Sequence, residues 1–133
     1  MIHRPADRLT FLVDRSLGRK IVVGALREAG ERVEALDDHF PQNAPDTEWL
    51  LEAGNRHWIV LSKDLAIRRN AYERELLLGA GVRAFILARQ DLSGQEMAKL
   101  FVDSLSAMRR RIARDAAPFI YGISRGGQFK RLA

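Results

Sequence analysis

Short runs of β-forming residues alternate with helical segments along most of this chain, and this alternation limits the folds it can adopt. The apolar runs occupy residues 9–13, 32–36, 58–62, 82–88 and 118–123. Between the first two runs, Leu17, Ile21 and Ala25 recur at helical spacing before Gly30. Such alternation through short connections is typical of a parallel sheet covered by helices. We therefore expect an α/β fold, a three-layer α/β/α sandwich with a mostly parallel central sheet.

Capping residues and turn formers predict where the helices begin and end. Asp46 suits the N-cap of one helix, and Ser93 with Glu96 forms a capping-box pattern at the start of another. The expected helices cover 16–29, 46–53, 71–78 and a segment from 93 into the arginines at 109–114. The expected loop, turn and basic tail cover 37–45, 126–127 and 128–133.

The length of 133 residues fits one domain, with a core at about 9–90 and a helix and basic segment at 91–133. Hydrophobic residues make up 47% of the chain, which excludes a disordered protein. The chain has no cysteine, so disulfides and thiolate metal sites are excluded. The apolar runs are too short for a membrane span, and the N-terminus lacks a secretory signal. We expect a cytoplasmic protein.

Acidic residues follow the predicted strands at the points where the strands end. They are Asp14 after the first run, Asp37 and Asp38 after the second, Asp64 after the third, and Asp46 on the helix before the third. Because parallel strands deliver their carboxyl ends to one edge of a sheet, these carboxylates are expected to converge. Clustered carboxylates repel each other, and a hard divalent cation such as Mg²⁺ or Mn²⁺ relieves that repulsion. Such a site can cleave phosphodiester bonds.

Each of these residues also has a simpler explanation. An isolated aspartate at a strand end is common, because aspartate favours turns and helix N-termini. His39 and His57 have no partner at metal-ligand spacing, and Ser16 and Ser62 have no histidine pairing that would make them nucleophiles. We expect Ser62 to hydrogen-bond the loop that carries Asp64. The pattern of several acids, rather than any single one, favours the metal site.

The formal charge is +5, from 22 basic and 17 acidic residues, and this moderate excess favours an anionic partner such as nucleic acid. Arg68 and Arg69 closely follow Asp64, where they are placed to hold a phosphate backbone. Lys63 either contacts phosphate or is solvated. The arginines at 109–111 end a helix, where cations suit the helix dipole.

Five stretches of the chain together resemble the PIN-like domains of the VapC toxin superfamily, especially its compact branch. The stretches are FLVD at 11–14, GERV at 30–33, DDHF at 37–40, DTEWL at 46–50 and IVLSKD at 59–64. The resemblance covers about residues 9–90 and depends on the order and spacing of these pieces. It implies a PIN-like α/β/α sandwich, an acidic pocket that binds Mg²⁺ or Mn²⁺, and endoribonuclease activity.

Carried over by position, the resemblance implies that Asp14 and Asp64 are metal ligands and catalytic residues. Asp46 matches the acidic residue that opens the intervening helix. Asp38 or Asp37 takes the place of the remaining acid, and we favour Asp38. Larger members carry a D-x-N motif after the first strand, whereas residues 14–16 read DRS here, so that Arg15 places a cation beside the pocket.

The leading hypothesis is therefore a metal-dependent endoribonuclease, the toxin of a type II toxin–antitoxin pair, with RNA as substrate and a small antitoxin protein as partner. Arg15, Lys63, Arg68 and Arg69 are the expected RNA contacts. Residues 91–133 would serve dimerisation, antitoxin contact or RNA contact. One alternative is a catalytically inactive PIN-like module that binds RNA or protein. A phosphotransfer receiver is disfavoured, because Asp14 stands alone after the first run.

Overall fold

The computed structural model describes residues 9–63, 70–88 and 90–133. In chain order, the elements are β1 (Thr10–Val13), η2 (Arg15–Leu17), α1 (Ile21–Glu28), β2 (Arg32–Ala35), α2 (Leu36–His39), α3 (Asp46–Asn55), β3 (Ile59–Ser62), α5 (Ala71–Gly79), β4 (Arg83–Leu87), α6 (Gly94–Asp103), α7 (Leu105–Arg114), β5 (Phe119–Ile123) and β6 (Phe129–Arg131). The five expected strands are all present within one or two residues of their predicted bounds.

The strands form one sheet in the order β2-β1-β3-β4-β5-β6. Strands β1 to β5 are parallel to their neighbours, and β6 pairs antiparallel with β5 at the edge. Along the chain, β1 is followed by β2 on one side, and β3 then lies on the other side of β1. The strand order therefore reverses beside β1, which creates a switch point between β1 and β3.

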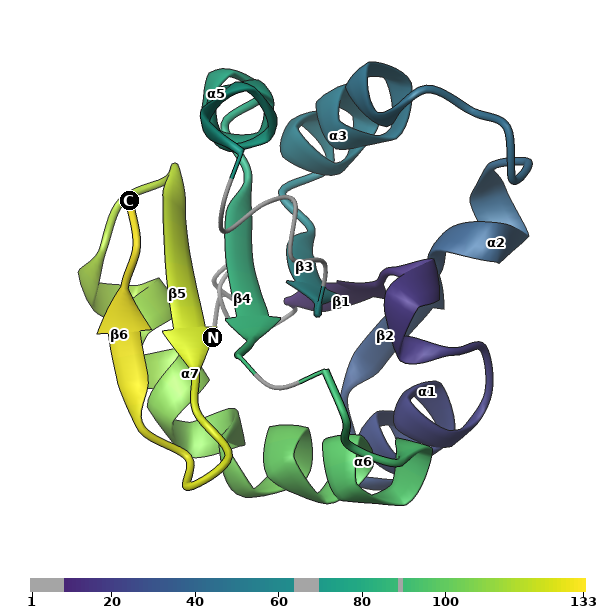
Figure 1. Cartoon of the computed structure of the whole chain (residues 1–133), viewed down its shortest axis with the longest axis vertical. Helices are drawn as coiled ribbons and strands as arrows, with labels where there is room; N and C mark the ends of the chain where they lie inside the picture. The colour runs from purple at the N-terminus through teal and green to yellow at the C-terminus, as the bar shows by residue number, and fades with distance from the viewer. Residues whose placement is uncertain (1–8, 64–69, 89) are drawn as a thin grey trace, which may run out of the picture.

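Helices cover both faces of this sheet (Figure 1). Successive strand residues point to opposite faces, so Phe11 and Val13 pack in the cluster that includes residues of α1, α6 and α7. Leu12, between them, packs in the second cluster with residues of α3 and α5. The expectation of a three-layer α/β/α sandwich with a mostly parallel sheet is confirmed.

The segment predicted as a loop after β2 contains a short helix, α2. Buried Leu36 anchors it, and Arg15 donates to the carbonyl oxygens of Phe40 (3.1 Å) and Pro41 (2.8 Å) beyond its end. This anchor comes from a residue far away in the sequence, which local patterns do not reveal. Asp46 was expected as an N-cap, but Pro45 occupies that position and Asp46 is the first residue of α3.

Two further differences lie in the C-terminal third. The helix expected from residue 93 is divided at Ser104, whose N–H bonds to the carbonyl oxygens of both Leu100 and Phe101, a tightening of the last turn. The predicted basic tail forms β6, because Phe129 packs against the rings of Phe85 and Tyr121 while Lys130 and Arg131 stay exposed. The capping box of Ser93 and Glu96 is present as predicted.

A close backbone contact joins the two helices on one face of the sheet. A Cβ atom added to Gly54 of α3 would lie 1.9 Å from the carbonyl oxygen of Ala80 at the end of α5. Only glycine therefore fits at this position. Within the described part of the chain, no helix is both long enough and apolar enough to span a membrane.

Candidate active site

The switch point between β1 and β3 carries a polar cluster at the carboxyl ends of both strands. The N–H of Asp14, directly after β1, donates to the carbonyl oxygen of Leu61 in β3 at 3.0 Å. Ser62 is the last residue of β3, and Lys63 follows it. Crevices at such switch points are where open α/β sheets bind their ligands.

The carboxylate of Asp14 is held by two serine hydroxyls. Oγ of Ser62 donates to Oδ2 of Asp14 at 2.8 Å, and Oγ of Ser16 donates to the same oxygen at 3.0 Å. Ser16 Oγ also accepts from the backbone N–H of Lys63 at 3.1 Å. Asp14 is 9% exposed and Ser62 is fully buried. The hydroxyls fix the orientation of the carboxylate without adding positive charge.

The relation of these two serines to Asp14 was not predicted from the sequence. Ser62 was expected to contact the loop of Asp64, and Ser16 was considered only as a nucleophile. The available signal was the position of Ser16 two residues after Asp14, which is the position of the asparagine in the D-x-N motif named above. The hydroxyl of Ser16 supplies a polar group at that point.

The acidic pair after β2 is divided between two environments. Asp37 lies in α2, where its carboxylate forms ion pairs with Nε of Arg15 and, at 3.5 Å, with Nε of Arg19. Asp38 is exposed, and no hydrogen bond or ion pair joins it to other residues in the described ranges. Arg15 was predicted to contact RNA. Its guanidinium connects η2 to α2, because it pairs with Asp37 and donates to the carbonyl oxygens of Phe40 and Pro41.

The carboxylate of Asp46 accepts a hydrogen bond from a residue of its own helix, α3. Its Oδ1 accepts a hydrogen bond from Nε1 of Trp49 at 2.9 Å, and Trp49 is buried. This bond satisfies an indole N–H that would otherwise be buried without a partner. Asp46 therefore has a structural role in α3, whatever else it does.

The remaining predicted site residues, Asp64, Arg68 and Arg69, lie outside the described residues. Over residues 9–63, 70–88 and 90–133, no three or more His, Asp or Glu side chains are grouped so that they could hold a metal ion. Asp14, Asp38 and Asp46 thus do not form such a group by themselves. The predicted four-carboxylate site stays a prediction.

The two histidines considered as ligands or bases lie elsewhere. His39 is bonded to Glu34 through Nε2 at 2.6 Å and packs against the ring of Trp58. His57 is exposed and has a positive φ of 58° in the turn before β3. Neither histidine contacts the Asp14 cluster.

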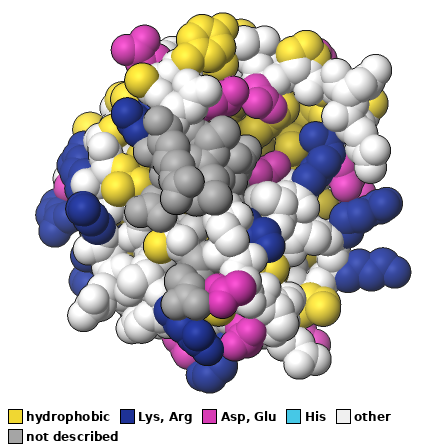
Figure 2. Space-filling model, viewed as in Figure 1, with side chains coloured by type: hydrophobic (Ala, Val, Ile, Leu, Met, Phe, Trp, Pro, Cys, Tyr) yellow, Lys and Arg dark blue, Asp and Glu magenta, His cyan; other side chains and the backbone are white. Residues whose placement is uncertain are grey.

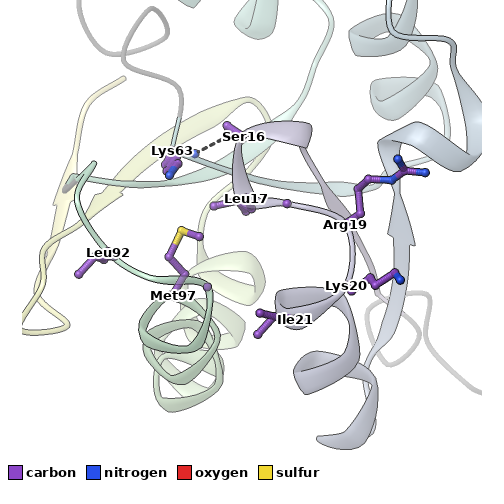
Figure 3. A pocket seen from close by; sticks show the side chains of 10 residues that line it. Ser16, Leu17, Arg19, Lys20, Ile21, Lys63, Leu92 and Met97 are labelled. Atoms are coloured by element: carbon purple, nitrogen blue, oxygen red, sulfur yellow. Dashed lines mark hydrogen bonds between the residues drawn. The ribbon is translucent and has the colours of Figure 1, made fainter.

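A pocket of about 740 Å³ opens beside the Asp14 cluster, between η2, the start of α1 and the start of α6 (Figure 3). Ser16 and Lys63 belong both to the cluster and to the pocket lining. Among the described lining residues, the charged ones are Arg19, Lys20 and Lys63. The apolar ones are Leu17, Ile21, Leu92 and Met97. Figure 2 shows basic side chains projecting from the edge of the molecule near η2, α1 and α2.

Comparisons with known proteins agree on one family. Residues 9–89 match the family described as PIN-like domain. The chain is 38% identical over 122 residues to a protein named "Putative ribonuclease VapC45" from Mycobacterium tuberculosis, and the match covers 89% of this chain and 88% of that protein. No solved structure matches the chain significantly.

Proposed function

Because this chain belongs to the family of PIN-like domains, we propose that it is a metal-dependent endoribonuclease of the VapC type. In this proposal it cleaves phosphodiester bonds of RNA and is the toxin of a toxin–antitoxin pair. The relative of similar length is named a ribonuclease, which supports the reaction class. A small antitoxin protein is the proposed partner.

The observation that carries the proposal is the fixed carboxylate of Asp14 at the switch point of the sheet. It is nearly buried, and two hydroxyls hold one of its oxygens. A carboxylate that is oriented before the substrate arrives costs little reorganisation during the reaction. Its position at the carboxyl ends of β1 and β3 is where a ligand of an α/β sheet would bind.

The donor set around Asp14 suits Mg²⁺ or Mn²⁺, since both ions prefer oxygen ligands and are often held by one or two carboxylates plus waters. We assign Asp14 and Asp64 as the ligands, with Asp38 and Asp46 as further candidates. The bound ion would activate water and stabilise the charge that develops on the phosphate during cleavage. Ser16 and Ser62 hold the Asp14 carboxylate in place.

Basic residues near this edge would hold the RNA backbone. Lys63 adjoins the Asp14 cluster through its bond to Ser16, and we assign Arg68 and Arg69 to the same task. A contact from Arg15 would compete with its bonds to Asp37, Phe40 and Pro41. Such phosphate contacts make binding weaken as salt is added.

The test is cleavage of purified single-stranded RNA by the full chain with Mg²⁺ or Mn²⁺, with and without a chelator. We expect cleavage that stops on chelation and returns when the ion is added in excess. The Asp14→Asn variant should bind RNA and keep its thermal transition but not cleave. Cleavage that persists in excess chelator, or equal cleavage by Asp14→Asn, would refute the proposal.

A second candidate function is binding without catalysis. It is favoured by residues 14–16, which read DRS in place of the D-x-N motif. In that case wild type and Asp14→Asn would bind RNA equally, neither would cleave it, and Mn²⁺ would not raise the thermal midpoint. A rise in that midpoint with Mn²⁺ that is lost in Asp14→Asn would exclude this candidate.

A further inference from the structure

We propose that the pocket between η2, α1 and α6 binds one nucleotide of the RNA next to the bond that is cleaved. This inference rests on the proposed ribonuclease function and deepens it, because it assigns a substrate subsite to residues outside the carboxylate cluster. The phosphate of that nucleotide would meet the basic rim, and its base would lie on the apolar surface.

The charge of the pocket favours an anion. Arg19, Lys20 and Lys63 are its charged lining residues in the described part of the chain, and all three are basic. Arg19 also lies 3.5 Å from Asp37, and the side chains of Arg19 and Lys20 extend along the outer rim, away from Met97 (Figure 3). Helix α1 begins at this pocket, and no side chain caps its N-terminus at Lys20. Uncapped N–H groups and the positive end of the helix dipole add to the attraction for phosphate.

The pocket also offers apolar surface of a kind that a phosphate alone would not use. Leu92 and Met97 line it from the side of α6, and Ile21 lines it from α1 (Figure 3). Ile21 is 52% exposed, one of the few large apolar side chains left in solvent. A nucleobase has an apolar face that would cover it. The volume of about 740 Å³ lies in the usual range of small-ligand sites.

The pocket is continuous with the candidate catalytic cluster. Ser16 donates a hydrogen bond to the Asp14 carboxylate and also lines the pocket. Lys63 lines the pocket too, and its backbone N–H donates a hydrogen bond to Ser16. A nucleotide in the pocket would therefore place its neighbouring phosphate group toward Asp14. This continuity favours an RNA segment over an unrelated small anion.

The test measures RNA binding without cleavage. A fluorescein-labelled 12-nucleotide single-stranded RNA that contains all four bases is titrated with the Asp14→Asn protein, and fluorescence anisotropy gives the affinity at several salt concentrations. When Lys20→Gln is introduced into the Asp14→Asn protein, RNA binding should weaken. The slope of log affinity against log salt concentration should fall in magnitude by about 0.7 to 1. When Ile21→Ala is introduced into the Asp14→Asn protein instead, RNA affinity should fall about three- to tenfold, and the slope against salt should stay unchanged.

Matched controls use exposed residues on other surfaces. Arg32→Gln removes one exposed positive charge at the amino end of β2, and Leu51→Ala shortens an apolar side chain of α3 that is 54% exposed. Both should leave the affinity within about twofold, because surface changes away from a site have small effects. Thermal midpoints of all variants check that the fold is intact.

The outcomes separate this inference from the proposed function. If Lys20→Gln and Ile21→Ala leave RNA affinity unchanged, or if the controls weaken it equally, the nucleotide pocket is overturned even when the wild type cleaves RNA. If the wild type does not cleave RNA but only the two pocket variants bind it more weakly, the nuclease function fails, and the pocket stands as an RNA-binding site but not as a subsite beside a cleaved bond.

Discussion

Two corners of the molecule hold an aspartate in a hydrogen-bonded cluster, and they differ in the partners that they use. Asp14, at the carboxyl ends of the parallel strands, accepts from the hydroxyls of Ser16 and Ser62. Asp115, at the end of α7, lies beside β5 and β6, where it contacts Tyr121 and Arg131. Its carboxylate accepts from Arg114 at 2.9 and 3.1 Å and from the hydroxyl of Tyr121.

The corner around Asp115 uses charged partners. Hydrogen bonds from Arg114 and Tyr121 hold the pKa of Asp115 well below its ordinary range, and Arg131 adds an ion pair at 3.7 Å. Arginines neutralise a carboxylate, whereas a serine hydroxyl orients it without adding charge of its own. The two carboxylates therefore differ in that Arg114 pairs with Asp115, while the hydroxyls of Ser16 and Ser62 orient Asp14.

The largest expected effect comes from removing each carboxylate in turn. Asp14→Asn should lower RNA cleavage by more than about 100-fold, since residues that only support a metal site typically cost 10- to 100-fold. Asp115→Asn should leave cleavage within about twofold, like other changes remote from a site, and lower the thermal midpoint. Steady-state cleavage and thermal unfolding of both variants check this, and similar losses of cleavage in both would break the comparison.

Removing one hydroxyl from the Asp14 corner should have the next largest effect. Ser62→Ala deletes a buried donor to a charged acceptor, so we expect about 1.5 to 3 kcal/mol lower stability and about 10- to 100-fold slower cleavage. Ser104→Ala is the matched control, because Ser104 is also buried but lies at the junction of α6 and α7. Denaturant unfolding and cleavage rates are measured for both, and unimpaired cleavage by Ser62→Ala would show that the hydroxyl does not position Asp14.

Residue patterns predicted the parts of the fold that depend on local periodicity. The core strands and the helix at 71–79 follow from apolar runs and helical spacing. The missed elements depend on distant contacts. Helix α2 is held by Arg15, and β6 has a single core residue, Phe129, within a basic stretch.

The candidate site was predictable in part for the same reason. Asp14 was identified because it ends an apolar run, and a parallel sheet then fixes the edge at which it lies. Its hydrogen bond with Ser62 joins two residues that are distant in the sequence and are brought together by the pairing of β1 with β3. The sequence could not separate Asp37 from Asp38, because neighbours on a short helix differ only in the direction of their side chains.

Asp37 and Asp38 allow the same comparison within one short helix, since Asp37 resembles Asp115 in having arginine partners. Asp37→Asn should lower stability by about 1 kcal/mol, because its ion pair is partly buried, and should change cleavage by less than about threefold. Asp38→Asn should leave stability unchanged, within about 0.5 kcal/mol. Denaturant unfolding and cleavage rates of both variants are the measurements. A large loss of cleavage in Asp37→Asn alone would place Asp37 with Asp14.

The smallest effect is expected from acid acting on Asp115. Because the pKa of Asp115 is lower in the folded chain than the value of about 3.9 expected in the unfolded chain, its ion pairs contribute stability that is complete well above pH 4. That contribution is lost as the pH falls below about 4, where the unfolded chain takes up the proton first. The difference in thermal midpoint between wild type and Asp115→Asn should therefore shrink from neutral pH toward pH 2.5. A constant difference over that range would show that Arg114 and Tyr121 do not stabilise the ionised form of Asp115, and the contrast with Asp14 would lose its electrostatic basis.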